Sequence, residues 1–402
     1  MKKKQLLILG GGTSGNIFSH RFPKELNMNE WDITVVDKSP IHYYQPGFLF
    51  IPFGIYKPED VVKNKSDLLH PKVNRIFSEI DRILPNENIV RLIDGIQLRY
   101  DYLIIGTGVN IAPDEVDGMK GELWGREVLD FYTYDGAVAL QMAMKNFRGG
   151  NLVIHVTEMP IKCPVAPLEF AFLSDDYFKR IGIRADTHIH YVTPLSGAFT
   201  KEEASSVFGN LLNEKNIHIH TEFNIAAVDN KSKEIISWDN RKIPFDLLVT
   251  VPTNMGSEMI KRSGIGDELN LIPTNPNTLK ANHFDNIFVG GDASDIPTSK
   301  AGSVIHFQSE VIIRNLLALI NDRPMQAEYH GHSNCFIETG NQKAILIDFD
   351  YQNDPTIGKF PIPSIGPLSL LKETRLNHLG KMAFKWIYWS RIIRGKDIPF
   401  TS

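Results

Sequence analysis

Short apolar runs that end in glycines or polar residues recur along the chain and predict the buried strands of parallel sheets, because such strands have apolar neighbours on both faces. Helical stretches alternate with several of these runs, which predicts an α/β fold. The predicted strands are Leu6–Leu9, Asp32–Val36, Asp101–Gly108, Asn151–Val156, His188–Val192, Leu247–Thr250 and Asn286–Ala293. The predicted helices are Leu168–Lys179, Glu202–Glu214 and Ser303–Leu319.

The first predicted strand runs into a glycine-rich turn that is typical of dinucleotide binding. The pattern G-x-G-x-x-G is matched by Gly10, Gly12 and Gly15, with Thr13 and Ser14 between the last two glycines. The first glycine allows the tight turn, the second lets the backbone approach a pyrophosphate, and the third lets the helix pack on the strand. The second strand ends at Asp37, where a carboxylate would accept ribose hydroxyl groups.

Two later strands belong to the same predicted domain. One ends in a turn that contains Thr107 and Gly108, and the other ends in Gly291 and Asp292. A nucleotide domain that resumes near residue 290 favours FAD over NAD, since the longer cofactor needs a second carboxylate such as Asp292. This arrangement resembles the two-dinucleotide-domain flavoproteins of the glutathione reductase type. Accordingly, residues 1–112 and 252–325 are predicted to form the FAD-binding domain, and residues 113–251 an inserted second Rossmann-like domain.

The inserted domain lacks the glycine loop that binds NAD(P)H. Its first strand is followed by Thr157–Glu169, a segment that contains three prolines and Cys163. Proline has no N–H group to offer a phosphate, and side chains at these positions block its close approach. The second domain is therefore not expected to bind a nicotinamide nucleotide.

Composition narrows the class of protein further. The chain has 402 residues, of which 42% are hydrophobic and 22% charged, with a net charge of −4; these values exclude a disordered chain and argue against a general nucleic-acid binder. Two cysteines are too few for a disulfide scaffold or a four-thiolate zinc site, and no metal site is predicted. The start, MKKKQLLILGGG, reads as a strand entering the glycine loop rather than as a signal peptide. No apolar run reaches the length of a spanning helix.

The two cysteines, Cys163 and Cys335, leave two interpretations open. Spacing alone favours unrelated buried thiols. However, Cys163 follows a strand of a nucleotide-binding fold, where ligands usually sit, and Lys162 beside it could favour the thiolate. Two thiols near a flavin could pass two electrons.

Through these motifs, the chain resembles the sulfide:quinone oxidoreductase family over essentially its whole length. The resemblance implies an FAD-dependent oxidation of sulfide by Cys163 and Cys335, to sulfane sulfur or polysulfide, with a membrane quinone as acceptor. It makes Glu169 a candidate for proton transfer, although a first-turn carboxylate stabilised by the helix dipole explains it equally well. It also places Lys300 and Gly302 near the flavin. The motifs are Gly10–Gly15, Pro160–Glu169, Gly290–Asp292, Lys300–Gly302, Cys335 and His378–Phe384.

The C-terminal region, residues 326–402, is predicted to hold hairpin strands around Cys335 and an amphipathic helical tail. Apolar residues recur in the tail at spacings of three and four, among seven basic residues and one acid. Such a helix suits the surface of an anionic membrane, although docking on the core or at a homo-oligomer interface is the alternative. By resemblance, Lys381, Phe384 and His378 line the quinone site. The apolar positions are Leu379, Met382, Trp386, Trp389 and Ile393.

The chain also departs from the family. A third cysteine that many members carry is missing, and no donor for a covalent flavin link is evident, so FAD is expected to bind non-covalently. The prediction is a peripheral enzyme on the cytoplasmic face of the membrane. Alternatives are a flavoprotein sulfide dehydrogenase that reduces a haem protein, a type II NADH:quinone oxidoreductase, and a flavin-bearing scaffold without turnover.

Overall fold

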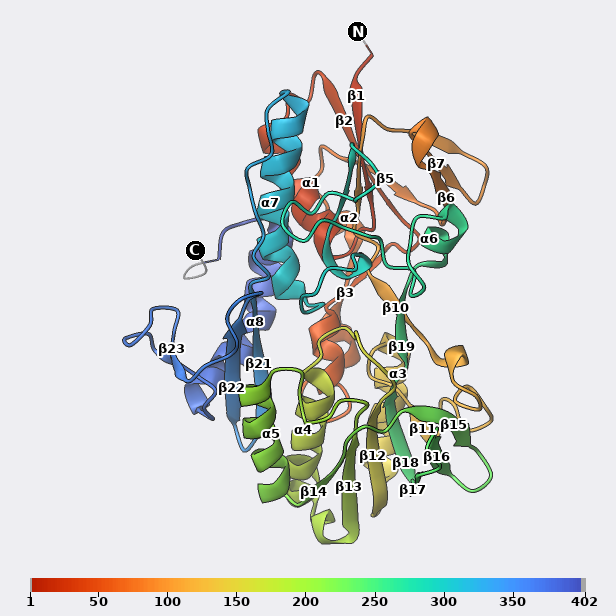
Figure 1. The fold of residues 1–402 in the computed structure, drawn as a ribbon, viewed down its shortest axis with the longest axis vertical. Coiled ribbons are helices and arrows are strands. Elements are labelled where there is room, and N and C mark those ends of the chain that lie inside the picture. Colours follow the sequence, from red (N-terminus) through yellow and green to blue (C-terminus); the bar gives the residue numbers. More distant parts are fainter. Residues whose placement is uncertain (1, 399–402) are drawn as a thin grey trace.

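A computed structural model describes residues 2–398, which form two lobes with a parallel sheet in each and a C-terminal region along one side (Figure 1). The predicted α/β fold with two nucleotide-fold sheets is confirmed. The domain boundaries given above stay a prediction.

The first lobe is built on a five-stranded parallel sheet in the order β20-β9-β1-β2-β5. Two helices, α1 (Thr13–Glu25) and α7 (Gly302–Ile320), cover one face of this sheet with a core of aliphatic and phenylalanine side chains. A small antiparallel sheet and α6 (Glu258–Ser263) cover the other face. The parallel strands are β1 (Lys4–Leu9), β2 (Trp31–Asp37), β5 (Asn74–Phe77), β9 (Tyr102–Ile105) and β20 (Ile287–Val289), and the antiparallel ones are β6 (Ile80–Leu84), β7 (Ile89–Leu92) and β8 (Gln97–Arg99).

The second lobe has a parallel sheet in the order β11-β18-β12-β13-β14. Helices α3 (Tyr134–Asn146), α4 (Ala166–Ile181) and α5 (Glu202–Glu214) contribute to the core on one face. The pair β10 (Val109–Ala112) and β19 (Thr253–Gly256) connects the lobes. The sheet strands are β11 (Val128–Leu129), β12 (Gly150–Val156), β13 (Thr187–Val192), β14 (Ile217–His220) and β18 (Leu247–Val251), and the other face carries β15 (Ile225–Asp229), β16 (Glu234–Ser237) and β17 (Lys242–Pro244).

The C-terminal region packs a four-stranded sheet against α4 and then lays α8 (Arg375–Ser390) across that sheet. The strands are β21 (Ser333–Gly340), β22 (Lys343–Phe349), β23 (Gly358–Phe360) and β24 (Leu368–Leu370). The segment around β23 projects from the body beside α8 (Figure 1). This packing brings residues near position 380 back to the loops that follow β1 and β12.

The apolar positions predicted for the tail do not share one environment, which corrects the single face expected from the sequence. Leu379 and Trp386 are exposed, whereas Trp389 packs against the rings of His42 and Tyr44. Ile393 is fully buried and lies beyond the end of α8. The helix therefore docks on the core with one side and keeps only part of the predicted face outside.

The helix α7 has the length and apolar composition that would allow it to cross a membrane. Half of its apolar stretch is buried inside the protein, and the helix packs on α1 and β21. Its apolar side chains therefore belong to the core of the first lobe.

Candidate active site

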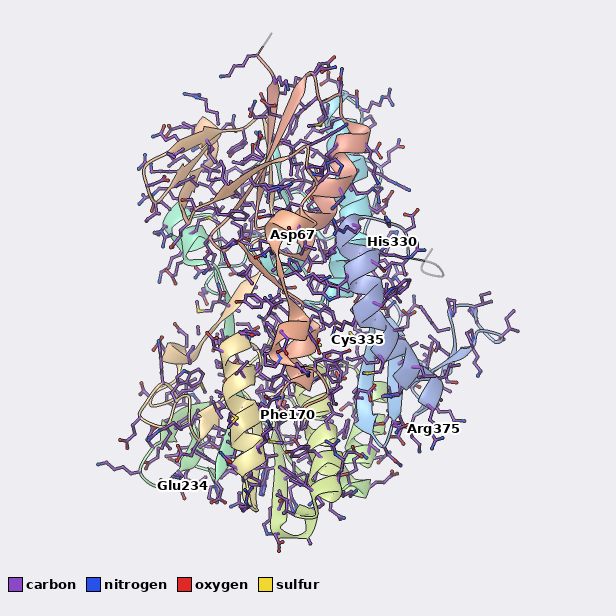
Figure 2. The ribbon with its side chains drawn as sticks, turned by 180° about the vertical axis from the view of Figure 1, so that it is seen from behind. Asp67, Phe170, Glu234, His330, Cys335 and Arg375 are labelled. Carbon is purple, nitrogen blue, oxygen red and sulfur yellow. The ribbon has the colours of Figure 1, made fainter. Side chains whose placement is uncertain are left out.

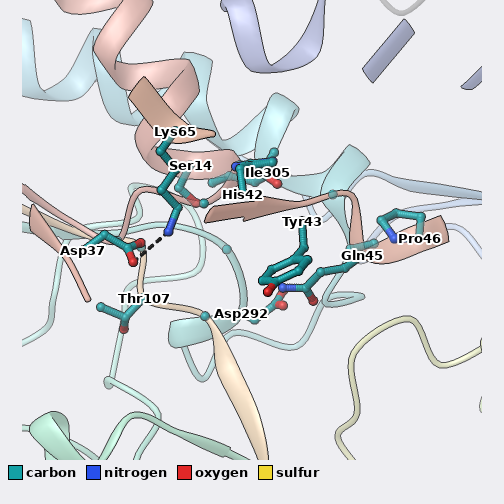
Figure 3. A pocket seen from close by; sticks show the side chains of 18 of the residues that line it. Ser14, Asp37, His42, Tyr43, Gln45, Pro46, Lys65, Thr107, Asp292 and Ile305 are labelled. Carbon is teal, nitrogen blue, oxygen red and sulfur yellow. Dashed lines mark ion pairs between the residues drawn. The ribbon is translucent and has the colours of Figure 1, made fainter. Parts of the chain in front are cut away.

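A cavity of about 220 Å³ opens where β1, β9 and β20 end and where α1 and α7 begin (Figure 3). Ten of the residues that the sequence marked for cofactor binding line it. Two helix N-termini face this space, and their unpaired N–H groups attract phosphate and other negative charge. The marked lining residues are Gly10, Gly12, Thr13, Ser14, Asp37, Thr107, Gly108, Gly291, Asp292 and Gly302.

The backbone of this cavity leaves room for a dinucleotide. No atom lies within 4 Å of where a Cβ would stand on Gly12 or Gly108, so the main chain is open to a ligand at both positions. The hydroxyl group of Thr107 is buried without a partner, as expected for a group that a ligand satisfies. Gly15 does not line the cavity. A Cβ there would come within 2.1 Å of the carbonyl oxygen of Gly10, so this glycine lets α1 pack on β1.

Asp37 lies at the end of β2, as expected, but it already has protein partners. Its Oδ2 accepts the N–H of Gly11 at 2.6 Å, and its Oδ1 pairs with the ammonium group of Lys65 at 2.7 Å (Figure 3). Burial lowers the pKa of Lys65, and Asp37 opposes that shift. Sequence reasoning missed Lys65, which belongs to the short helix α2 (Lys65–Leu68).

A chain of buried polar side chains packs against the glycine loop and links it to α8. The Nδ2 of Asn16 lies 3.2 Å from Nδ1 of His42, and Nε2 of His42 lies 2.8 Å from the hydroxyl group of Tyr388. The Tyr388 hydroxyl group in turn lies 2.8 Å from that of Thr13. Burial lowers the pKa of His42 to about 4, so this imidazole is neutral near pH 7.

A second cavity of about 120 Å³ adjoins the first and is lined by Cys163, one of the two cysteines predicted to act on sulfur. The two cavities adjoin because they share five lining residues, and together they are called the channel. The shared residues are Gln45, Pro46, Asp292, Ala301 and Gly302. The second cavity is lined by Cys163, Glu169, Lys300 and Lys381 together with aromatic side chains.

Cys163 is held at the tip of the loop between β12 and α4. Its backbone has a positive φ of 45°, and its N–H donates to the carbonyl oxygen of Lys300 at 2.8 Å. Burial raises the pKa of the thiol to about 11, and Lys381 works against that shift. The cation that favours the thiolate is thus Lys381 and not Lys162, which corrects the expectation from the sequence. The ammonium group of Lys162 instead lies 3.2 Å from Oε1 of Gln45.

Cys335 lies on β21, level with the junction of the lobes (Figure 2). It packs on the same apolar cluster as Cys163. Burial raises its pKa further than that of Cys163, and the neighbouring Cys163 contributes to the shift. Both cysteines are free thiols in this structure. The fold therefore brings together two thiols that are 172 residues apart.

Glu169 and Lys381 form a buried ion pair beside these thiols. The Nζ of Lys381 lies 2.9 Å from Oε1 of Glu169, whose side chain is fully buried in the first turn of α4. Burial raises the pKa of Glu169, while Lys381 opposes the shift. Burial also disfavours the ammonium form of Lys381, but Glu169 and Cys163 outweigh that effect and raise its pKa. Both pKa shifts favour the protonated form of the group concerned, so the Glu169–Lys381 pair retains a proton in this cavity.

Of the remaining predicted residues, Lys300 lines the second cavity, whereas Phe384 and His378 do not line either cavity. Lys300 is buried, and its ammonium group donates to the carbonyl oxygens of Asp292 and Ser294 at 3.1 and 2.6 Å. Phe384 packs on the apolar core that also includes both cysteines, and His378 pairs with Glu338 at 2.8 Å. Glu338, like Lys65, His42 and Tyr388, carried no motif that could have marked it in the sequence.

Comparison with known proteins identifies relatives of the whole chain. No family model matches it. The curated "Sulfide:quinone oxidoreductase, mitochondrial" of Dictyostelium discoideum is 28% identical, and the match covers 98% of this chain and 86% of the relative. The protein of the same name from Mus musculus is 25% identical, with 97% and 86% covered. The sulfide:quinone oxidoreductase structure from Aquifex aeolicus superposes with a TM-score of 0.81 at 19% identity, covering 98% of this chain and 92% of that one. These relatives confirm the resemblance that the sequence motifs indicated.

Proposed function

We propose that this chain, a relative of the sulfide:quinone oxidoreductases, is a flavin-dependent enzyme that oxidises hydrosulfide and reduces a quinone. Cys163 and Cys335 are its redox pair, and FAD is held without a covalent bond. The observation that carries the proposal is the channel, in which the cavity of the glycine loop adjoins a cavity lined by Cys163, Glu169 and Lys381.

The residues of the first cavity fit FAD. The glycine loop and the start of α1 would hold the pyrophosphate, Asp37 the ribose, and Asp292 the ribityl section. Lys300 and the start of α7 would provide positive potential at the flavin end. Bound FAD would supply two-electron transfer between the sulfur centre and the quinone.

The cysteines supply the sulfur chemistry. In the oxidised pair, hydrosulfide attacks the Cys163–Cys335 disulfide, which leaves a persulfide on one cysteine and a thiolate on the other. The persulfide and the thiolate then join as a trisulfide, releasing one proton and two electrons. Because burial raises the pKa of both thiols, the thiolate formed in this step is held at high energy and is a strong nucleophile. Lys381 provides the opposing positive charge.

The quinone is proposed to reach the channel near Lys381, Phe384 and His378, all of which belong to α8. The outer side of α8 exposes Leu379 and Trp386. The neighbouring segment around β23 exposes three isoleucines, Ile357, Ile362 and Ile365. Exposed apolar side chains among basic residues suit the surface of an anionic membrane, which supports peripheral binding at this end of the molecule.

Anaerobic stopped-flow spectroscopy of the FAD-loaded protein tests the reaction. Sulfide should bleach the flavin absorbance, a soluble quinone should restore it, and Cys163→Ser or Cys335→Ser should abolish bleaching while leaving FAD bound. Bleaching by NADH and not by sulfide would contradict the proposal and favour the type II NADH:quinone oxidoreductases.

Vesicle flotation tests the membrane surface. The protein should float with anionic phosphatidylglycerol vesicles, and Trp386→Ser combined with Leu379→Ser should reduce that binding. A matched control is Trp238→Ser, which removes an exposed tryptophan from the second lobe. Equal flotation of all three proteins would contradict the proposed surface.

A further inference from the structure

A line of ionisable side chains leads from the buried thiol cavity to the surface of α8. Glu169 and Lys381 stand at its inner end, beside Cys163. Glu338 follows on β21, and its backbone N–H donates to Oε1 of Glu169 at 3.0 Å. His378 stands at the outer end, with Nδ1 lying 2.8 and 3.0 Å from the two carboxyl oxygens of Glu338. Side-chain exposure is 0% at Glu169, 13% at Lys381, 4% at Glu338 and 22% at His378, so His378 is the most exposed of the four.

Glu338 is built to exchange a proton near neutral pH. Burial raises its pKa to about 7; the neighbouring Glu169 adds to that shift, while His378 and Lys381 oppose it. Tyr56 also faces the group, and its own pKa is raised by burial. The charge of Lys381 acts on both Glu169 and Glu338, so the three groups form one electrostatic cluster.

The proposed reaction requires such a path. Oxidation of hydrosulfide to sulfane sulfur releases one proton and two electrons, and reduction of a quinone to a quinol consumes two protons and two electrons. Each turnover that starts from hydrosulfide therefore takes one proton from the solvent. Within the described residues, the side chains just named connect the buried pair to the surface.

We propose that Glu338 and His378 form the outer half of a proton relay that carries this proton from solvent to the Glu169–Lys381 pair. The inference rests on the proposed function and extends it. His378 takes a proton from water on Nε2 and yields the proton on Nδ1 to Glu338. As Lys381 gives a proton to the reduced quinone, it takes the proton of Glu338, and the Glu169 carboxylate stabilises the ammonium group throughout.

A purely structural role is the alternative, since the pair also ties β21 to α8. The two roles differ in what substitution does. A structural tie would change stability and leave the pH dependence of the reaction alone. A relay would change the pH dependence of the step that consumes protons and leave sulfide-driven bleaching largely intact.

The test uses the FAD-loaded full chain and follows two steps separately, bleaching by sulfide and reoxidation by a soluble quinone, from about pH 6 to about pH 9. The variants are Glu338→Gln and His378→Asn. His332→Asn is the matched control, because it breaks a similar 2.8 Å pair with Asp348 on the same hairpin. We expect Glu338→Gln to slow reoxidation about tenfold and to remove a transition near pH 7. His378→Asn should slow reoxidation as well, and added imidazole should rescue it.

Infrared titration provides a readout that does not depend on turnover. The protonated carboxyl band of Glu338, assigned by its loss in Glu338→Gln, should disappear as pH rises through about 7. Should that band be absent already at about pH 5, or should reoxidation in Glu338→Gln keep the pH profile of the unaltered protein, the relay is refuted while sulfide bleaching still stands. An unaltered protein that sulfide does not bleach refutes the proposed function, and the relay with it.

Discussion

The hydroxyl group of Tyr388, near the end of the last helix, lies 2.8 Å from the hydroxyl group of Thr13, at the start of the first. The contact links residues that are 375 positions apart. It makes α8 part of the wall that faces the dinucleotide cavity, since Tyr388 itself lines that cavity. The glycine loop therefore depends on the C-terminal region for its support.

Replacing Tyr388 with phenylalanine should weaken both the fold and cofactor binding. The variant leaves Nε2 of buried His42 without its hydrogen-bond partner, so the free energy of unfolding should fall by about 1–3 kcal/mol. FAD affinity, measured by flavin fluorescence, should fall several-fold. Tyr100→Phe is the control, because the buried hydroxyl group of Tyr100 has no partner to lose. Equal urea unfolding curves for Tyr388→Phe and the unaltered protein would rule out this support.

Replacing Glu169 with glutamine should be strongly destabilising. The ammonium group of Lys381 would then be buried without its carboxylate, which costs about 3–5 kcal/mol in comparable cases. The double variant Glu169→Gln, Lys381→Met should recover much of that loss, because no buried charge remains. Urea denaturation of the three proteins measures both effects. A double variant less stable than Glu169→Gln would show that the pair stabilises the fold beyond mutual neutralisation.

The thiol of Cys163 should resist alkylation at neutral pH. With a pKa of about 11, its reaction with iodoacetamide should still accelerate between about pH 8 and about pH 10, where an ordinary thiol levels off. The Cys335→Ser background isolates the signal in mass spectrometry. Lys381→Met should slow the reaction further, since Lys381 favours the thiolate. A plateau reached by about pH 8 would contradict this environment.

Glu338 should make stability depend on pH in a definite direction. Its pKa in the folded protein is about 7, above the 4.5 of an ordinary glutamate, so its contribution is fully present below about pH 4.5 and is lost as pH rises through 7. Stability should therefore fall between about pH 5 and about pH 8 more in the unaltered protein than in Glu338→Gln. The urea midpoints of both proteins at the two pH values measure this loss of stability. An equal loss in the two proteins would contradict the raised pKa of Glu338.

Asp37→Asn should lower FAD affinity by about tenfold or more, because the variant loses a ribose acceptor and leaves Lys65 buried without its carboxylate. Asp32→Asn provides the comparison, since Asp32 lies on the same strand and pairs with Lys3 at the surface. Isothermal titration of the two variants with FAD measures the difference. Equal FAD affinities of the Asp37→Asn and Asp32→Asn variants would show that Asp37 does not contribute to cofactor binding.

The sequence predicted those parts of the site that lie in continuous motifs. The glycine loop, Asp37 and the carboxyl ends of the strands were found because parallel strands bring their ends to one edge of a sheet. The bounds of α5 match the predicted helix because its apolar period is regular from Glu202 to Glu214. The pair of thiols was found through family resemblance and could not be derived from spacing.

The rest depended on how the C-terminal region packs. Lys162 precedes Cys163 in sequence, but the chain turns at Cys163 with a positive φ, and Lys381 from α8 becomes the cation that acts on the thiol. The same packing assigns His42, Tyr388 and Glu338 to the site. No local pattern encodes contacts between segments that are hundreds of residues apart.

The position of α8 also sets a time order for biosynthesis. The helix contributes Tyr388 to the first cavity and Lys381 to the second, and just beyond it the side chain of Arg394 donates to the backbone of Leu68. A nascent chain that has not yet released these residues from the ribosome has its glycine loop but neither cavity in finished form. Cofactor loading therefore belongs to the end of translation, and a chain cut short before α8 should emerge colourless even with its entire nucleotide-binding sheet in place.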